Sequence, residues 1–257
     1  MSEEMKFPSE IVSLPSKGFF YAEDNPLSSG ELEMRYMTAK DEDILTSQNL
    51  IRRGVVIDKL LKSLVVDKSI DLDSMLIGDK NALMVAARVL GYGKDYNFEV
   101  DCPSCNEHNK DNVDLTQLVE KEINFDDLEK GTNEFGWTLP NSKIDITFKL
   151  LTQKDEREIE ADLKGLKKIS KGQVESEITT RLKKVITSID GNAERSFINS
   201  FVDNSLLAVD SLPFREHLIS VTPDVDMTYN FECSMCEYIE EVTVPMTVQF
   251  FWPSTRV

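Results

Sequence analysis

The sequence predicts an α+β fold that is internally duplicated, so that a unit of a strand, several helices and a β-hairpin occurs twice. Three observations predict this fold. The word YNFE begins at Tyr96 and again at Tyr229, and each copy leads into a Cys-x-x-Cys pair. A Thr-x-Lys-Asp-Glu word also occurs twice, beginning at Thr38 and at Thr152. Around these words, both halves follow the same order of strand, helices, strand, Cys-x-x-Cys and strand.

Each unit is expected to begin with a strand that leads into a capped helix. The stretches 32–45 and 146–159 both start with an alternating or apolar run and continue with a helical pattern. Thr38 and Thr152 stand where N-cap residues belong, and the acidic residues that follow them favour the positive end of a helix.

Two further helices are expected in each unit, followed by the hairpin. Residues 55–65 match residues 177–189 in the spacing of their apolar positions, and residues 77–90 match residues 201–212. The YNFE strands come next, and an alternating strand follows each cysteine pair. Chance similarity between short amphipathic segments explains this shared order less well than duplication does.

The expected domain organisation has four parts. Residues 1–29 form an extended N-terminal arm, because three prolines before Gly30 are incompatible with a regular helix. The first repeat covers residues 30–120, and the second repeat covers residues 143–257, each with its own Cys-x-x-Cys hairpin. Residues 121–142, which are acidic and contain glycine and proline, form the connector. The arm either wraps around its own domain or docks on a partner.

The composition indicates a protein with a packed core whose partners are other proteins. Hydrophobic residues make up 40% of the 257 residues, which supports a core, and no apolar stretch reaches the roughly 18 residues of a membrane span. The first residues lack the apolar region of a secretory signal, so we expect the protein to stay in the cytoplasm where it is made. A net charge of −17 should repel nucleic acid and anionic membranes.

The four cysteines of the chain have the spacing of a structural zinc site. Two Cys-x-x-Cys pairs form a complete ligand set, and each pair is expected at the tip of a β-hairpin. One Zn²⁺ per chain would join the two repeats through this zinc-ribbon-like module of four cysteines and would leave no open coordination position for chemistry. The expected zinc ligands are Cys102, Cys105, Cys233 and Cys236.

Other interpretations of the cysteines remain open. The stretch CPSC resembles a thioredoxin-like redox motif, although such a motif needs a helix that begins at its first cysteine. Disulfides or a metal-free pair of hairpins are further alternatives, and His108 is a possible substitute ligand that we expect to face solvent instead.

Phe98 lies four residues before Cys102 and Phe231 lies two before Cys233. Because this difference is even, both phenylalanines are expected on the same, inward face.

The sequence carries no motif that indicates catalysis. Phosphate-binding loops, dinucleotide-binding glycine motifs, zinc-protease motifs and nucleophile elbows are all absent from the sequence. Only two histidines, His108 and His217, are present. We therefore expect a non-enzymatic protein with no catalytic and no cofactor-binding residues apart from the zinc ligands.

Most of the chain resembles a known viral family, most densely over residues 7–64 and onward through both cysteine words. The stretches LPSKGFFY (14–21), NPLSSGELEMRYMTAKDEDIL (25–45) and VIDKLL (56–61) resemble the baseplate hub proteins of T4-type tailed bacteriophages, a group that includes hub subunits and hub assembly chaperones. The resemblance implies a late viral protein that helps to assemble the central hub of the baseplate in the cytoplasm of the infected host. Its partners would be other baseplate hub proteins.

Three functions follow from these observations. An assembly chaperone for the baseplate hub is favoured, a structural hub component that stays in the virion baseplate is the alternative, and a Cys-x-x-Cys thiol oxidoreductase is the alternative from another class. The resemblance offers no active site to transfer. It supports only the four cysteines as zinc ligands.

The aromatic end of the chain has two interpretations. Phe250, Phe251 and Trp252 follow the last alternating strand. They are expected to close the core, and an exposed partner site is the alternative.

Overall fold

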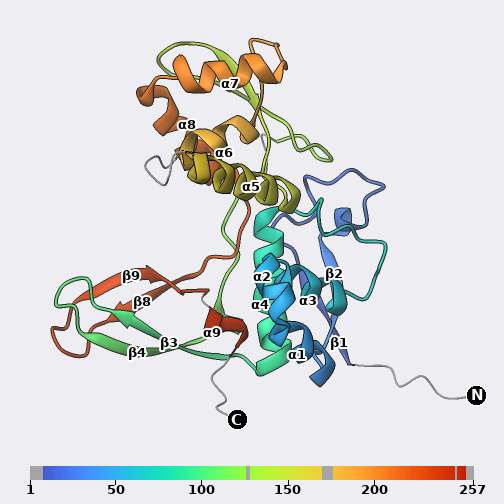
Figure 1. Cartoon of the computed structure of the whole chain (residues 1–257), viewed down its shortest axis with the longest axis vertical. Helices are drawn as coiled ribbons and strands as arrows, with labels where there is room; N and C mark the ends of the chain where they lie inside the picture. Colours follow the sequence, from blue (N-terminus) through green and yellow to red (C-terminus); the bar gives the residue numbers. More distant parts are fainter. Residues whose placement is uncertain (1–7, 126–127, 170–175, 247, 253–257) are drawn as a thin grey trace, which may run out of the picture.

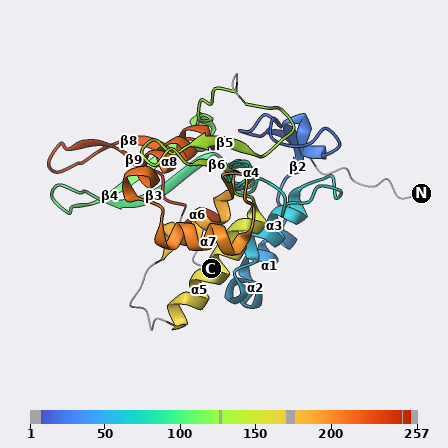
Figure 2. The ribbon, with the colours of Figure 1, turned by 90° about the horizontal axis from the view of Figure 1, so that it is seen from above.

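The computed structural model describes residues 8–125, 128–169, 176–246 and 248–252. The chain forms two helical lobes, one above the other in Figure 1, and two long β-hairpins lie side by side on one flank. Figure 2 shows the same two hairpins together from above. The fold is therefore α+β, as predicted. In the described residues, no helix is both long and apolar enough to cross a membrane.

The secondary structure consists of short antiparallel sheets and helices. The strands are β1 (Ser9–Ser13), β2 (Glu31–Arg35), β3 (Asp95–Asp101), β4 (His108–Asp114), β5 (Phe135–Thr138), β6 (Asp145–Phe148), β7 (Ile186–Ile189), β8 (Thr228–Glu232) and β9 (Ile239–Thr243). The helices are α1 (Ala39–Thr46), α2 (Gln48–Arg53), α3 (Val56–Leu64), α4 (Ile77–Tyr92), α5 (Gln153–Ile169), α6 (Glu177–Val185), α7 (Arg195–Asn204), α8 (Ala208–Val221) and α9 (Val248–Phe251).

The first lobe packs helices α1–α4 against the β1–β2 hairpin. Apolar residues three and four apart on α3 are fully buried, among them Leu60, Leu61 and Leu64. Val65, the residue after α3, bridges Met34 on the side of β2 that faces away from β1. The third strand of this lobe is thus reduced to a single bridge.

The second lobe packs helices α5–α8 against the sheet β5–β6–β7. Phe148 of β6 is fully buried and pairs with Ile186, the first residue of β7. The α6 helix buries Leu182 and Val185 at helical spacing and runs directly into β7. Both lobes thus pack helices on an antiparallel strand pair. The second lobe has a complete third strand followed by α7, whereas in the first lobe α2 precedes the Met34–Val65 bridge.

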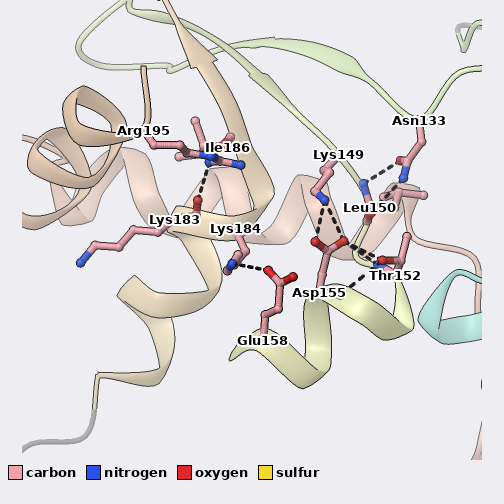
Figure 3. A network of polar contacts seen from close by, with 10 residues as sticks. All are labelled: Asn133, Lys149, Leu150, Thr152, Asp155, Glu158, Lys183, Lys184, Ile186 and Arg195. Carbon is pink, nitrogen blue, oxygen red and sulfur yellow. Dashed lines mark hydrogen bonds and ion pairs between the residues drawn. The ribbon is translucent and has the colours of Figure 1, made fainter. Parts of the chain in front are cut away.

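The predicted helix caps form in both lobes and share their hydrogen bonds. Asp41 accepts hydrogen bonds from the backbone and hydroxyl of Thr38, and Arg35 binds it through two nitrogens at 2.8 Å. Asp155 accepts the corresponding bonds from Thr152, and the Lys149 ammonium replaces the guanidinium (Figure 3). Each carboxylate thus caps its helix and also binds the strand before it.

These contacts also determine the protonation of the capping carboxylates. Burial raises the pKa of Asp155, but the hydrogen bonds from Lys149 and Thr152 outweigh burial and hold the pKa below its ordinary value. The pKa of Asp41 is lowered in the same way, because Arg35 and Thr38 outweigh burial. Both caps are therefore charged at neutral pH.

A second pair of buried aspartates attaches each N-terminal hairpin to the last helix of its lobe. Asp79 in the first turn of α4 accepts the backbone N–H and the hydroxyl of Ser16. Asp210 in the first turn of α8 accepts the backbone N–H groups of Asn141 and Ser142. Both turns follow a Leu-Pro dipeptide, a correspondence that was not among the predictions.

The segments expected to be arm and connector are parts of the lobes. Within residues 1–29, β1 pairs with β2, and the Phe20 and Tyr21 side chains are buried, so the described part of the arm wraps around its own domain. Within residues 121–142, β5 pairs with β6, and the Phe125 ring contacts the ring of Phe20.

One of the predicted helix matches is wrong. Residues 201–212, which we matched with 77–90, run across the end of α7 and the start of α8. The helix that directly precedes the second hairpin is α8, so it takes the place of α4. The error arose because α7 and α4 have a similar apolar period, and the buried aspartate that distinguishes α8 was not recognised.

The aromatic C-terminal residues close the core, as expected. Phe250 and Phe251 are buried, and the Phe250 ring meets the Tyr96 ring edge to face. The Trp252 indole nitrogen donates a hydrogen bond to the carbonyl of Leu45 at 2.9 Å. Phe250 and Trp252 therefore anchor this segment on residues of the first half of the chain.

Candidate metal centre

The cysteine pairs lie in the turns of two equivalent hairpins, β3–β4 and β8–β9. Phe98 and Phe231 are both buried, which confirms that the even difference in spacing keeps them on an inward face. Counted from the first cysteine of each pair, however, Tyr229 takes the position of Phe98, and Phe231 takes the position of Val100. Relative to the cysteines, the two YNFE words are therefore offset by two residues. Because the offset is even, side chains on the same face of each strand are still buried.

Both Cys-x-x-Cys turns have the same backbone hydrogen bonds. The Cys102 amide donates to the Glu107 carbonyl at 2.9 Å, and the Asn106 amide donates to the Cys102 carbonyl at 2.8 Å. In the other turn, Cys233 and Glu237 donate the corresponding bonds, at 2.9 and 3.1 Å. Asn106 and Glu237 both have a positive φ, 57° and 56°. This tight turn directs both sulfurs of a pair to one side of the hairpin.

The structure brings all four predicted cysteines together at the contact of the two hairpins. The Sγ atoms of Cys102 and Cys236 are 3.7 Å apart, as are those of Cys105 and Cys233. All four sulfurs lie within 4.8 Å of one another. A disulfide requires about 2.05 Å. A tetrahedron with zinc–sulfur bonds of about 2.3 Å has edges of about 3.8 Å. The donor set therefore fits a tetrahedral thiophilic ion.

A buried asparagine joins the two hairpins beside the sulfurs. The side-chain oxygen of Asn109, on β4, accepts hydrogen bonds from the amide and hydroxyl of Ser234 in the other hairpin. Its side-chain nitrogen lies 3.8 Å from the Cys233 sulfur. Asn109 is only 6% exposed. No local sequence pattern indicates this role of Asn109, because Cys233 and Ser234 lie more than a hundred positions away.

The thiols of the cluster differ in acidity. The backbone N–H groups of Met235 and Cys236 point at the Cys233 sulfur and lower the pKa of that thiol to about 6. The Glu107 amide lowers the pKa of Cys105 as well, but the neighbouring thiols, Cys236 first, outweigh it and raise the value to about 12. Four sulfurs this close do not all ionise unless a cation offsets their mutual repulsion. Binding a divalent metal ion therefore releases protons from this site.

His108 lies outside the cluster. It is exposed, its Nδ1 is 2.7 Å from Asp101, and its Nε2 is 3.3 Å from Glu99. These carboxylates, Asp101 first, raise the pKa of His108. The residue faces solvent, as expected.

The position of the cysteines also bears on the redox alternative. Cys102 and Cys233, the first cysteine of each pair, are buried, whereas Cys105 and Cys236 are exposed. Each pair lies in a turn between two described strands, and no helix begins at Cys102 or at Cys233. The amides that point at the Cys233 sulfur are those of a tight turn and not those of a helix start.

The fold and the cluster together define a class of protein, namely a two-lobed α+β protein in which a cluster of four thiols joins hairpins from both halves. A family model described as T4 bacteriophage base plate protein matches residues 19–252. The chain belongs to this family, which confirms the resemblance to T4-type baseplate proteins. Searches of curated proteins and of solved structures found no match.

Proposed function

We propose that this baseplate-family protein is a non-enzymatic assembly chaperone for the central hub of the phage baseplate. It binds other hub proteins in the cytoplasm of the infected host. The observation that carries the baseplate role is the family match over residues 19–252, nearly the whole chain. The centre built from the cysteines is a structural clamp and not a reaction site, which favours a binding role. A net charge of −17 favours protein partners with basic surfaces.

The same proposal includes one structural Zn²⁺ per chain, bound by Cys102, Cys105, Cys233 and Cys236. The fit of the sulfur separations to a tetrahedron supports it. The four thiolates fill the coordination sphere, and Asn109 orients the second pair from the opposite hairpin. The ion would hold the end of one lobe to the end of the other.

We also infer that the two lobes arose by duplication of one unit. Three pairs of contacts support this inference: the Thr–Asp caps of α1 and α5, the buried aspartates of α4 and α8, and the identical cysteine turns. Each unit then begins at its N-terminal hairpin strand, β1 or β5. On this inference, the segments expected to be arm and connector belong to the two repeats.

The stoichiometry of the chain in viral particles tests the chaperone role. An epitope-tagged chain should associate with hub intermediates in infected cells and be absent from purified mature tails. Quantitative mass spectrometry of both fractions measures this difference. A permanent tail protein of known copy number, tagged in the same way, is the control. Full stoichiometry in mature tails would refute a transient role.

A permanent structural role in the baseplate is the second candidate function. The description of the matching family as base plate protein favours it. On this alternative the chain is located in the virion, and the same mass-spectrometry experiment detects it there in fixed copy number.

The thiol oxidoreductase remains the candidate from another class. It predicts disulfide-reductase activity that depends on one Cys-x-x-Cys pair alone. Insulin reduction by the purified chain, with and without a zinc chelator, measures this activity. Activity that persists when one pair is replaced by serine, and is lost when the other pair is replaced, would contradict a purely structural role.

A further inference from the structure

One difference between the two lobes lies between the first strand and the last helix of each lobe. In the second lobe, Trp137 of β5 faces Ile146 across the hairpin, and in the first lobe Val12 of β1 faces Leu32 at the same step before the Leu-Pro turn. His217 follows the buried aspartate of α8 by seven residues. The residue seven after the buried aspartate of α4 is Ala86. A bulky pair in one lobe thus corresponds to a small pair in the other.

In the second lobe these side chains fill the space between strand and helix. The Trp137 and His217 rings stack with their centroids 3.9 Å apart and their planes at 14°. In the first lobe, Val12 and Ala86 instead line a groove of about 370 Å³ between β1, α4 and residues 115–120. By the spacing given above, Val12 and Ala86 correspond to the two residues of the aromatic pair in the other lobe.

The helix face that lines this groove is apolar where its counterpart is not. On α4 the lining residues are Ala82, Val85, Ala86 and Val89. Three of the four equivalent positions on α8 are Pro213, Glu216 and Ser220. If the groove side of α4 only contacted water, it would not need to be apolar throughout. Exposed apolar grooves commonly bind partners.

The strand beside the groove has an open edge. Among the described residues, β2 is the only strand hydrogen-bonded to β1. The Leu14 amide donates to Gly30, and Pro8 accepts from Tyr36, so every second residue between them is bonded to β2. The N–H and C=O groups of Ser9, Ile11 and Ser13 therefore point away from β2. Ile11 is 61% exposed.

We propose that an extended segment of a partner protein docks in this groove, adds a strand to the open edge of β1 and inserts an aromatic side chain between Val12 and Ala86. The stack of Trp137 on His217 shows that a ring fits this frame. The outward backbone groups require a main-chain partner, as in other strand-addition complexes. Glu10 and Glu120 lie in the groove lining, and Lys17 already pairs with Glu120, so we expect a basic residue of the segment beside Glu10.

The acidic character of the chain argues against a second copy as the occupant. Two chains that each carry −17 repel each other, whereas a basic segment is attracted. This inference deepens the proposed chaperone role, because it names the chemistry of the segment that the chain holds. It also fits a permanent subunit, so its test is independent of the particle stoichiometry.

The test uses the full chain and the peptide acetyl-Lys-Val-Thr-Trp-Thr-Val-Lys-amide as a probe. Titration into ¹⁵N-labelled protein should shift the amides of Ser9, Ile11, Ser13 and Ala86, and should slow the hydrogen exchange of Ile11 and Ser13. We expect a Kd on the order of 100 μM, because one added strand buries far less than a standard interface. Replacing the tryptophan of the peptide by serine should weaken binding about tenfold, and replacing both lysines by glutamate should also weaken it.

Two variants of the chain separate docking from folding. Ile11→Pro removes an outward N–H without removing a hydrogen bond to β2, so it should preserve the β1–β2 hairpin and abolish binding of the peptide. The control variant Ile11→Thr should retain peptide binding. The double variant Val12→Trp/Ala86→His rebuilds the stack of the second lobe. It should fill the groove and reduce binding at least about tenfold, with an unchanged circular dichroism spectrum.

Several outcomes would overturn the proposal. They are the absence of shifts at the groove amides, equal binding of the serine peptide, and full binding by both Ile11→Pro and the filled double variant. Analytical ultracentrifugation tests whether a second copy of the chain occupies the groove instead. A dimer of the free chain that Ile11→Pro dissociates would show that a second copy, and not a basic partner segment, covers the edge.

Discussion

Replacing Cys233 and Cys236 together with serine should separate the two hairpins and destabilise the whole chain. Under the proposed zinc clamp, the link from Cys105 through the metal to Cys233 closes a segment of 128 residues. A cross-link across a loop of that length lowers the entropy of the unfolded chain by an amount equivalent to about 5 kcal/mol at 25 °C. For a chain of this size, about 5 kcal/mol corresponds to a decrease in Tm of about 10–20 °C.

Metal analysis and thermal unfolding measure this effect together. Inductively coupled plasma mass spectrometry should find one zinc per wild-type chain and none in the double variant. Circular dichroism melts should show the same decrease in Tm for the variant and for wild type with excess chelator. Met235→Ser is the matched control, because Met235 lies between the two cysteines, is 70% exposed and offers no ligand.

The agreement between chelation and mutation is the sharpest part of the test. Serine at buried position 233 adds a small cost of its own, whereas a chelator does not change the covalent chain. A metal-free wild-type protein with an unchanged Tm would refute the clamp. Zinc retained by the double variant would show that the ion is bound elsewhere.

Three further predictions follow from other contacts. Asp155→Asn should lower the free energy of unfolding by on the order of 3 kcal/mol at pH 7. Because the folded state lowers the pKa of Asp155, this loss should be complete above about pH 4 and should vanish as the pH falls through the lowered pKa. Urea unfolding at each pH measures it. Gly78→Ala should lower the free energy of unfolding in urea by at least about 1–3 kcal/mol, because the added Cβ would lie 1.8 Å from the Pro223 carbonyl oxygen. Gly165→Ala, which has open space around it, should be neutral or stabilising. Asn109→Ala should weaken zinc affinity about 10–100-fold in chelator competition, because it removes the bonds that orient the second cysteine pair, and unchanged affinity would contradict that role.

The sequence carried enough information to predict the parts of this fold that depend on local chemistry. The caps at Thr38 and Thr152 form where the pattern placed them, since a side-chain cap involves residues three positions apart. The cysteine turns also followed from local spacing. The four sulfurs come together if the two hairpins lie against each other. The prediction of one shared metal site, based on the matched order of elements in the two halves, required this contact.

Contacts between distant segments could not be predicted from local patterns. Nothing near Asp79 or Asp210 shows that each accepts hydrogen bonds from a Leu-Pro turn more than sixty residues earlier in the chain. The second helix match failed for the same reason, because an apolar period says only that a helix is amphipathic and not which helix it replaces. Asn109 also acts through a residue of the other hairpin.

The separation of the two cysteine pairs has a consequence for synthesis on the ribosome. The first pair is made 128 residues before the second, from Cys105 to Cys233. At translation rates of about 5–20 residues per second, the nascent chain exposes one dithiol turn for on the order of 10 s before its partner exists. Under the proposed zinc clamp, metal loading therefore coincides with completion of the chain. A truncated product would lack the site and remain recognisable to cellular proteases as unfinished.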